Sequence, residues 1–203
     1  MPVYLDYNAT TPLRPEARAA VLAALEQVGN PSSIHSFGRQ ARAVVEDSRR
    51  KVALAVGSTP EQVVFTSGGT EANALALRGS GATGVLVSAT SHDSVRKQMP
   101  CTLLPVLPSG LLDLAAVEAA LAPPSGQKIL SVEWVNNETG IIQPVAALLA
   151  LCRKYGALLH LDAVQALGRI ALDVQPDYLT LSAHKIGGPQ GSGALVVART
   201  APL

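Results

Sequence analysis

The chain has 203 residues, of which 48% are hydrophobic and 3% aromatic, and its formal net charge is +1. This length suits one substantial domain with a short addition, and the near-neutral charge argues against nucleic acid or an anionic membrane surface as partner. No apolar run approaches the length of a membrane span, and the residues after Met1 do not resemble a signal peptide, so we expect a cytoplasmic protein. Two cysteines, Cys101 and Cys152, are too few and too far apart to suggest a disulfide framework or a metal site.

Residues 1–57 predict an N-terminal segment with two helices, and residues 58–203 predict a larger domain. Pro15 suits the first turn of a helix, which we expect over residues 15–28. The second helix is expected over residues 36–56, because apolar side chains recur there at helical spacing.

From residue 58 onward, near-continuous apolar runs alternate with helical segments. This pattern is typical of a parallel sheet that is covered by helices on both faces, so we predict an α/β fold. The expected strands are residues 63–66, 85–89, 102–106, 128–135, 158–161, 178–181 and 194–197. The expected helices between them are residues 70–78, 94–99, 114–121 and 144–155.

The segment 179–189, Leu-Thr-Leu-Ser-Ala-His-Lys-Ile-Gly-Gly-Pro, is the strongest candidate for chemistry. Its apolar strand ends in a polar cluster that contains Lys185 and opens into a glycine-rich loop. A desolvated lysine has a lowered pKa and can act as a nucleophilic amine, most obviously toward the carbonyl of pyridoxal phosphate. For this segment alone, an ordinary surface lysine at a strand-to-loop turn would be the better interpretation.

Polar residues also follow other predicted strands, and in such sheets ligands bind at the carboxyl ends of the strands. Gly69 and Thr70 open a helix whose backbone N–H groups could bind phosphate, although a plain helix cap at Thr70 is an equally good interpretation. Asp162 follows an apolar run and could keep a pyridine nitrogen protonated, or it could cap a following helix.

His92 could stack on a cofactor ring and move protons, although a lone loop histidine is more often solvated or capping. Asn137 and Gln165 could hydrogen-bond the ring oxygen, and Ser182 and His184 could reach a phosphate. Taken singly, each of these four residues could equally serve loop and turn hydrogen bonding. Together, the strand ends predict a pyridoxal-phosphate site.

Six segments, in order along the whole chain, resemble the signature segments of cysteine desulfurases, which belong to the class V aminotransferase branch of fold-type I pyridoxal-phosphate enzymes. They are residues 5–12, 29–33, 65–73, 135–140, 160–165 and 182–189. The resemblance implies a three-layer αβα sandwich with a mostly parallel seven-stranded sheet whose last strand is antiparallel. It also implies a homodimer and a sulfur-acceptor or scaffold protein as partner, as in iron–sulfur cluster assembly.

The same resemblance implies the conversion of L-cysteine to L-alanine, with the sulfur passing to an enzyme cysteine as a persulfide. Lys185 would hold pyridoxal phosphate and then act as the base at the substrate Cα, and His92 would stack on the ring and move protons. The remaining contacts would be Asp162 on the pyridine nitrogen, Asn137 and Gln165 on the ring oxygen, and Gly69, Thr70, Ser182 and His184 around the phosphate.

Members of this family are longer, and three of their parts find no match here: a carboxyl-terminal small domain, an arginine for the substrate carboxylate, and a loop with the nucleophilic cysteine. We therefore expect an incomplete chain that binds the cofactor and associates through the apolar surface that a small domain would cover. Two alternatives stay open: another class V enzyme, such as a selenocysteine lyase or an aminotransferase, and a catalytically silent cofactor-domain fragment that acts as an assembly partner. The asparagine-rich segment 135–140 favours the desulfurase.

Overall fold

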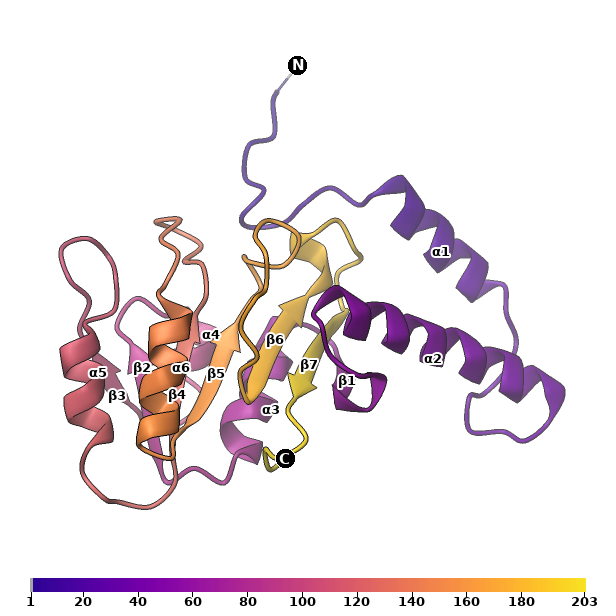
Figure 1. The fold of residues 1–203 in the computed structure, drawn as a ribbon. Helices are drawn as coiled ribbons and strands as arrows, with labels where there is room; N and C mark the ends of the chain where they lie inside the picture. Colours follow the sequence, from indigo (N-terminus) through magenta and orange to yellow (C-terminus); the bar gives the residue numbers. More distant parts are fainter. Residues whose placement is uncertain (1) are drawn as a thin grey trace.

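Seven strands form one sheet within residues 2–203, the part of the chain that the computed structural model describes (Figure 1). Their order across the sheet is β1-β7-β6-β5-β4-β2-β3. The strands are β1 (Val63–Thr66), β2 (Gly84–Ser88), β3 (Thr102–Leu104), β4 (Lys128–Glu133), β5 (Leu158–Asp162), β6 (Tyr178–Ser182) and β7 (Gly193–Val197).

The sheet is parallel from β6 through β5, β4 and β2 to β3, whereas β7 runs antiparallel to both β6 and β1. The predicted fold class is thereby confirmed, including the antiparallel last strand. All five residues of β6 are buried, as expected for a strand covered on both faces, and the hydroxyl of Thr180 within it is hydrogen-bonded to the buried His160 at 2.9 Å.

Helices cover both faces of the sheet through two separate hydrophobic clusters. On one face, α5 (Leu114–Leu121) and α6 (Val145–Lys154) pack against the central strands through buried residues such as Leu148. On the other face, α3 (Gly69–Gly79) and the short α4 (Asp93–Arg96) pack through buried residues such as Ala76. This is the predicted three-layer αβα arrangement.

Proline explains two elements that are shorter than we predicted. The third strand was expected over residues 102–106 but ends at Leu104, since Pro105 has no N–H for the ladder, and Val106 forms only an isolated bridge with Leu112. The helix expected over residues 94–99 ends at Arg96, because a residue that precedes a proline, here Met99 before Pro100, is disfavoured in the helical region.

The fourth predicted strand, over residues 128–135, is also too long, because it ends at Glu133. Val135 instead pairs in an isolated antiparallel bridge with Ile142 across the turn that follows. The chain therefore leaves the sheet just before the polar loop, which places Glu133 at the sheet edge where ligands bind in this fold class.

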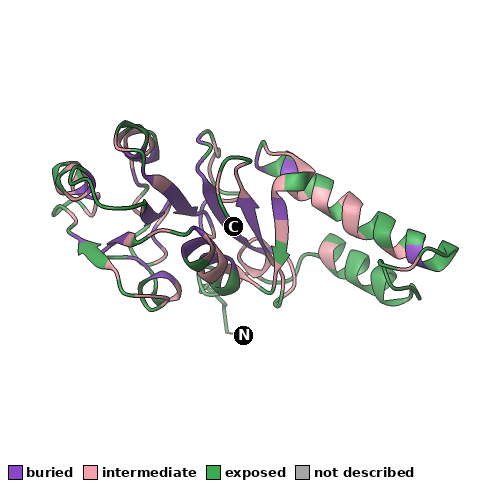
Figure 2. Ribbon diagram, turned by 90° about the horizontal axis from the view of Figure 1, so that it is seen from below, coloured by how far each residue is buried: buried purple, intermediate pink, exposed green. Residues whose placement is uncertain are grey.

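The N-terminal helices form an arm that extends to one side of the sheet, beyond β1 (Figures 1 and 2). None of the eleven described residues of α1 (Pro15–Leu25) is buried, and α1 ends before the expected Val28. The long α2 (Ser36–Ala55) joins the core through Ala53, near its C-terminal end, and the short 3-10 helix η1 (Pro60–Gln62) then leads into β1.

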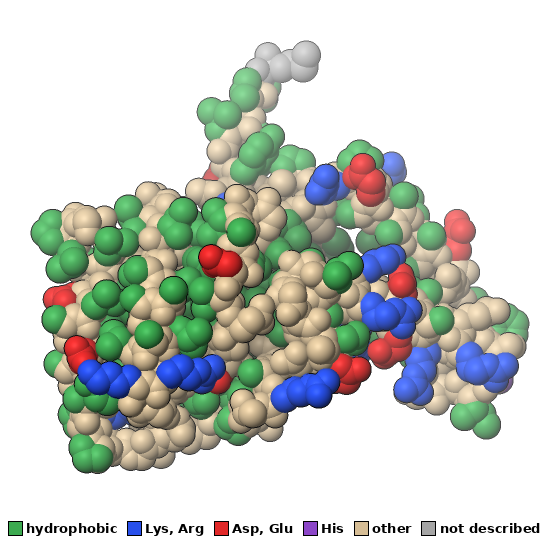
Figure 3. All heavy atoms as spheres, viewed as in Figure 1, with side chains coloured by type: hydrophobic (Ala, Val, Ile, Leu, Met, Phe, Trp, Pro, Cys, Tyr) green, Lys and Arg blue, Asp and Glu red, His purple; other side chains and the backbone are tan. Residues whose placement is uncertain are grey.

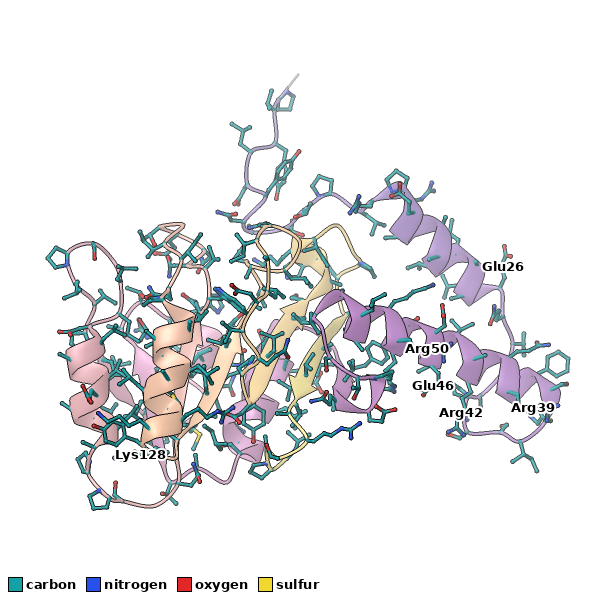
Figure 4. All side chains as sticks on the ribbon, viewed as in Figure 1. Glu26, Arg39, Arg42, Glu46, Arg50 and Lys128 are labelled. Carbon is teal, nitrogen blue, oxygen red and sulfur yellow. The ribbon has the colours of Figure 1, made fainter. Side chains whose placement is uncertain are left out.

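The outer part of this arm is charged. Side chains of both signs alternate over α2 in Figure 3, and several pairs are in contact within the helix, such as Lys51 and Asp47 at 2.6 Å. Figure 4 labels charged residues on this arm, Glu26 just after α1 and, along α2, Arg39, Arg42, Glu46 and Arg50. Exposed pairs of this kind add little stability, so they contribute little to holding the arm in place. No helix in residues 2–203 is long and apolar enough to cross a membrane.

Candidate functional site: a cavity at the carboxyl edge of the sheet

A cavity of about 420 Å³ opens at the carboxyl ends of the parallel strands. All nine residues that the sequence suggested for a cofactor site line it: Gly69, Thr70, His92, Asn137, Asp162, Gln165, Ser182, His184 and Lys185. These residues come from five different segments of the chain. The structure therefore brings the predicted set together in one place, as expected when the carboxyl ends of parallel strands share an edge.

Lys185 ends a 3-10 turn, η2 (Ala183–Lys185), that directly follows β6. The side chain is half-buried, and its Nζ donates a hydrogen bond of 2.5 Å to the backbone oxygen of Asn8. Burial is the main cause that lowers the pKa of Lys185, and the nearby guanidinium of Arg169 lowers it further, whereas Asp162 opposes the shift. A lowered pKa leaves more of the amine uncharged, and the uncharged amine is the form that acts as a nucleophile.

An N-terminal strap, residues 8–14, crosses over the lysine turn. Thr11 donates its backbone N–H to the oxygen of His184 and its hydroxyl to the oxygen of Lys185, both at 2.8 Å. Farther along, the N–H of Arg14 donates to the oxygen of Gly187 at 2.9 Å. Gly187 has φ +84°, and a Cβ at this position would collide with the Arg14 side chain. Both the backbone conformation and the lack of space therefore favour glycine at this turn.

Arg169 fastens this strap to the site, a role that the sequence did not suggest. Its guanidinium donates to Oδ1 of Asn8 at 3.1 Å, to the oxygen of Lys185 at 3.2 Å and to Oε1 of Gln165. Gln165 in turn donates its Nε2 to the oxygen of Asn8 at 2.9 Å. Because Asn8 lies more than 150 residues from these partners, no local sequence pattern could have indicated the contact.

Asp162, the last residue of β5, is buried at the base of the cavity. One carboxylate oxygen accepts the Nδ2 of Asn73 at 2.8 Å, and the other accepts the N–H of Val164 at 3.0 Å. Burial raises the pKa of Asp162, and the hydrogen bond from Asn73 works against that shift. The sequence did not single out Asn73, although its position one helical turn after Thr70 places it on the same face of α3.

The opposite end of the cavity suits a phosphate. α3 begins at Gly69 without any side-chain cap among the described residues, so its first N–H groups point toward the cavity unpaired by a capping side chain. Gly68, not Thr70, occupies the cap position, which rules out the simple interpretation of Thr70 as the helix cap. The hydroxyl of Ser182 is buried and has no hydrogen-bond partner within residues 2–203. A buried polar group without a partner is costly, and a bound phosphate would satisfy it.

His184 lies beside this phosphate end and is held by the strap, since its Nδ1 is 3.2 Å from the hydroxyl of Thr10. Burial lowers the pKa of His184, and the positive charge of Lys185 lowers it further. The imidazole is therefore held in its neutral form, which can still donate one hydrogen bond to an anion.

His92 lies on the far side of the cavity and caps α4. Its Nδ1 accepts the N–H of Ser94 at 3.0 Å, so the capping interpretation is correct for this nitrogen. The backbone N–H of His92 donates to Oε1 of Glu133 at 2.6 Å. Ser94 therefore holds the imidazole and Glu133 holds the backbone of His92, and the residue lines the cavity although it caps α4.

Glu133 is the third residue of the site, after Arg169 and Asn73, that the sequence did not suggest. It is the last residue of β4, it lines the cavity, and it is 7% exposed. Burial raises the pKa of Glu133 to about 7, partly opposed by the hydrogen bond from the His92 N–H, and the neighbouring Asp162 raises it further. Its position inside a run expected to be a continuous strand gave no signal for this role.

The sequence profile of the family described as Aminotransferase class-V matches residues 3–202. The chain belongs to this family. Two curated relatives are named "Cysteine desulfurase IscS": the protein of Dechloromonas aromatica is 40% identical and that of Methylococcus capsulatus 39%, and each match covers 98% of this chain and 54% of the relative. The chain thus spans about half the length of the curated relatives it matches.

Two solved structures superimpose closely on this chain. A NifS-like protein from Rickettsia africae is 35% identical with a TM-score of 0.90, over 96% of this chain and 57% of that one. DndA from Streptomyces lividans is also 35% identical, with a TM-score of 0.81, over 97% of this chain and 60% of that one. The resemblance to cysteine desulfurases and the fold-type I architecture inferred from the sequence are confirmed by these matches.

Proposed function

We propose that this chain provides the pyridoxal-phosphate-binding portion of a cysteine desulfurase. The observation that carries the proposal is the single cavity in which a lysine of lowered pKa, a buried carboxylate and an uncapped helix N-terminus face one another. The curated relatives named as cysteine desulfurases support this choice over other class V activities.

The residues fit the cofactor at each of its functional groups. The N–H groups of Gly69 and Thr70, the orphan hydroxyl of Ser182 and the neutral imidazole of His184 would bind the phosphate. The carboxylate of Asp162 would pair with the ring nitrogen, and a protonated ring nitrogen would in turn keep that buried carboxylate ionised. When bound, pyridoxal phosphate supplies an electron sink for negative charge that develops at the substrate Cα.

The other residues would orient the ring and move protons. His92 would cover one face of the ring, and Asn137 and Gln165 would hydrogen-bond its phenolic oxygen. Lys185 would hold the carbonyl carbon of the cofactor through its Nζ and would serve as the base at the substrate Cα, because its lowered pKa leaves more of the amine uncharged and able to accept a proton. The strap contacts this amine directly, because Nζ donates a hydrogen bond to the backbone oxygen of Asn8.

The chain does not offer a thiolate for the sulfur-transfer step. Cys152 is buried in α6, where burial raises its thiol pKa to about 12, and Cys101 lies just before β3. Neither of these cysteines, both of which are described by the structure, lines the 420 Å³ cavity. A thiol with such a raised pKa is a poor nucleophile, so we propose that the persulfide cysteine belongs to another polypeptide segment.

We propose further that residues 58–203 form the cofactor domain and residues 1–57 an arm that contributes to assembly. A second, mainly apolar groove of about 1130 Å³ lies between α2 and the sheet, lined by residues such as Val52, Phe65 and Ile186. Its exposed apolar surface supports association, with a second copy as in a homodimer or with a sulfur-acceptor or scaffold protein. L-cysteine would be the substrate, in the cytoplasm.

A direct experiment tests cofactor binding. The purified chain is mixed with pyridoxal phosphate, the visible absorption is recorded, and the complex is reduced with borohydride before peptide mass analysis. We expect a yellow protein with the cofactor mass on the peptide that contains Lys185, and no such mass in Lys185→Ala. The exposed Lys154→Ala is the matched control and should label normally. A wild-type chain that stays colourless at saturating cofactor would refute the proposal.

A second experiment tests the sulfur chemistry. The loaded chain is incubated with L-cysteine and a reductant, and sulfide and alanine are measured. We expect neither product from this chain alone. Steady release of sulfide would show that one of its own cysteines completes the reaction, contrary to the proposal.

A further inference from the structure

Glu133 joins two loops that border the cavity. β4 and β5 pair in register, with Glu133 opposite Asp162, and both carboxyl groups line the same cavity. Oε1 of Glu133 accepts the backbone N–H of His92 at 2.6 Å, and Oε2 accepts Nδ2 of Asn136 at 2.7 Å. One buried side chain therefore bonds simultaneously to the loop that carries His92 and to the loop that carries Asn137.

Asn136 transmits this contact to the rest of its loop. Its Oδ1 accepts the N–H groups of Glu138 and Thr139 at 3.0 and 2.9 Å, and also the Thr139 hydroxyl at 3.0 Å. Its Nδ2 additionally donates to the oxygen of Thr90, in the loop before His92, at 3.1 Å. With three donors on its oxygen, the amide of Asn136 has a fixed orientation, and only an acceptor at Glu133 suits its Nδ2.

The position of Glu133 is expensive for the folded protein. Glu133 is 7% exposed, and its carboxyl group stands beside the carboxyl of Asp162, with Glu138 as a further acidic neighbour and the backbone N–H of His92 as a donor. Burial next to like charge raises its pKa to about 7. Costly polar groups of this kind concentrate at functional sites, where stability is given up for geometry.

We propose that Glu133 is a positioning residue, whose two carboxylate oxygens hold the His92 loop and the Asn137 loop in the arrangement that orients the cofactor ring. The inference deepens the proposed function and rests on it. Glu133 acts on the ring indirectly. Both of its carboxylate oxygens accept hydrogen bonds from the two loops, and residues of these loops would contact the ring.

Two substitutions separate this role from general stability. Glu133→Met keeps the length of the side chain and removes both acceptors. Glu133→Gln keeps an acceptor for the N–H of His92 but turns an NH₂ group toward Nδ2 of Asn136, so that one of the two contacts is lost. Glu118→Gln is the control, since Glu118 accepts a hydrogen bond from Lys154 on the exposed surface far from the cavity.

The test uses the full chain of each variant. Binding of pyridoxal phosphate is titrated by absorbance, the circular dichroism of the bound cofactor is recorded, and amide hydrogen exchange of residues 89–93 and 136–140 is measured without cofactor. We expect Kd to rise about tenfold or more in Glu133→Met and less in Glu133→Gln, which corresponds to the loss of hydrogen bonds to a charged group. The cofactor signal should weaken per bound molecule, both loops should exchange faster, and Glu118→Gln should match the wild type.

A purely structural role would lower the melting temperature without changing the dichroism of the bound cofactor or the relative exchange of these two loops. Unchanged Kd, dichroism and loop exchange in Glu133→Met would overturn the proposal, and if that variant does not fold, the same criteria apply to Glu133→Gln. If the wild type itself binds no pyridoxal phosphate, the proposed function fails, and the exchange measurement alone then decides whether Glu133 holds the two loops.

Discussion

Replacing Glu133 with glutamine should change how the stability of the cofactor-free chain depends on pH. The pKa of this carboxyl is about 7 in the folded protein, against an ordinary value of 4.5. Between these values the unfolded chain releases its proton while the folded chain retains it, so the free energy of unfolding falls as the pH rises. At 1.36 kcal/mol per pH unit, the wild type should lose up to about 3.4 kcal/mol between pH 4.5 and 7 through this group.

Glutamine does not titrate, so the variant escapes this loss. Its mismatch with Asn136 costs a roughly constant amount at every pH, and the other titrating groups, including Asp162, are common to both proteins. We therefore expect the free energy of unfolding of Glu133→Gln, relative to the wild type, to increase by about 2–3 kcal/mol from pH 5 to pH 8.

Urea unfolding of the two cofactor-free proteins at pH 5, 6, 7 and 8 measures this difference. The Glu118→Gln variant is the control. Because hydrogen bonds from Lys154 and Tyr155 lower the pKa of Glu118 below its ordinary value of 4.5, this carboxyl is ionised in both the folded and the unfolded chain from pH 5 to pH 8, and its difference from the wild type should stay constant over this range. If the two curves for wild type and Glu133→Gln run parallel across this range, the folded-state pKa of Glu133 is ordinary and the reasoning is wrong.

Three further predictions concern other parts of the molecule. Arg169→Met should raise the pKa of Lys185, because the guanidinium is one of the causes that lower it, and the pH titration of the bound cofactor's absorption should shift to higher pH; an unshifted titration would count against this. Ser182→Ala should stabilise the cofactor-free chain by about 1 kcal/mol or more in urea unfolding, since it removes an unpaired buried hydroxyl, but millimolar inorganic phosphate should protect the wild type more than this variant, and equal protection would contradict the assignment. Native-state thiol labelling should modify Cys101 and leave Cys152 untouched until the chain unfolds, because Cys152 is buried with a pKa of about 12; equal labelling rates would contradict this.

The sequence was most informative where one physical rule governs many residues. Apolar runs covered on both faces identify parallel strands, and polar residues that follow them must meet at one edge, so the amino-acid sequence alone places Asp162 and Lys185 together. Proline limited the accuracy of the boundaries. A strand that ends at Leu104 looks longer in sequence because the apolar character continues after Pro105 into an isolated bridge.

The parts of the site that could not be predicted depend on contacts between distant segments. In the sequence, Glu133 directly follows apolar residues of β4 and looks like part of a longer strand. Because β4 ends at Glu133, before Trp134, this side chain can bond to the loops beyond the strand. Arg169 and Asn8 look like ordinary turn residues in sequence, and their pairing depends on how residues 8–14 return to the lysine turn. The sequence offered a helix cap and a place in the cofactor site as alternative roles for His92. The structure shows that the residue caps α4 and lines the cavity at the same time.

The strap also has a consequence for the order in which the chain folds. The hydrogen bonds of Thr10 and Thr11 to His184 and Lys185 join residues 174 positions apart, close to the full length of the chain. During synthesis, the N-terminal segment leaves the ribosome first but must wait until residues 184 and 185 have been made before it finds its partners. Contacts of such long sequence separation form late, because the loop-closure entropy must be paid before they contribute. The amine of Lys185 therefore gains its final surroundings in one of the last folding steps, and a cofactor that binds earlier meets a lysine that is still open to water.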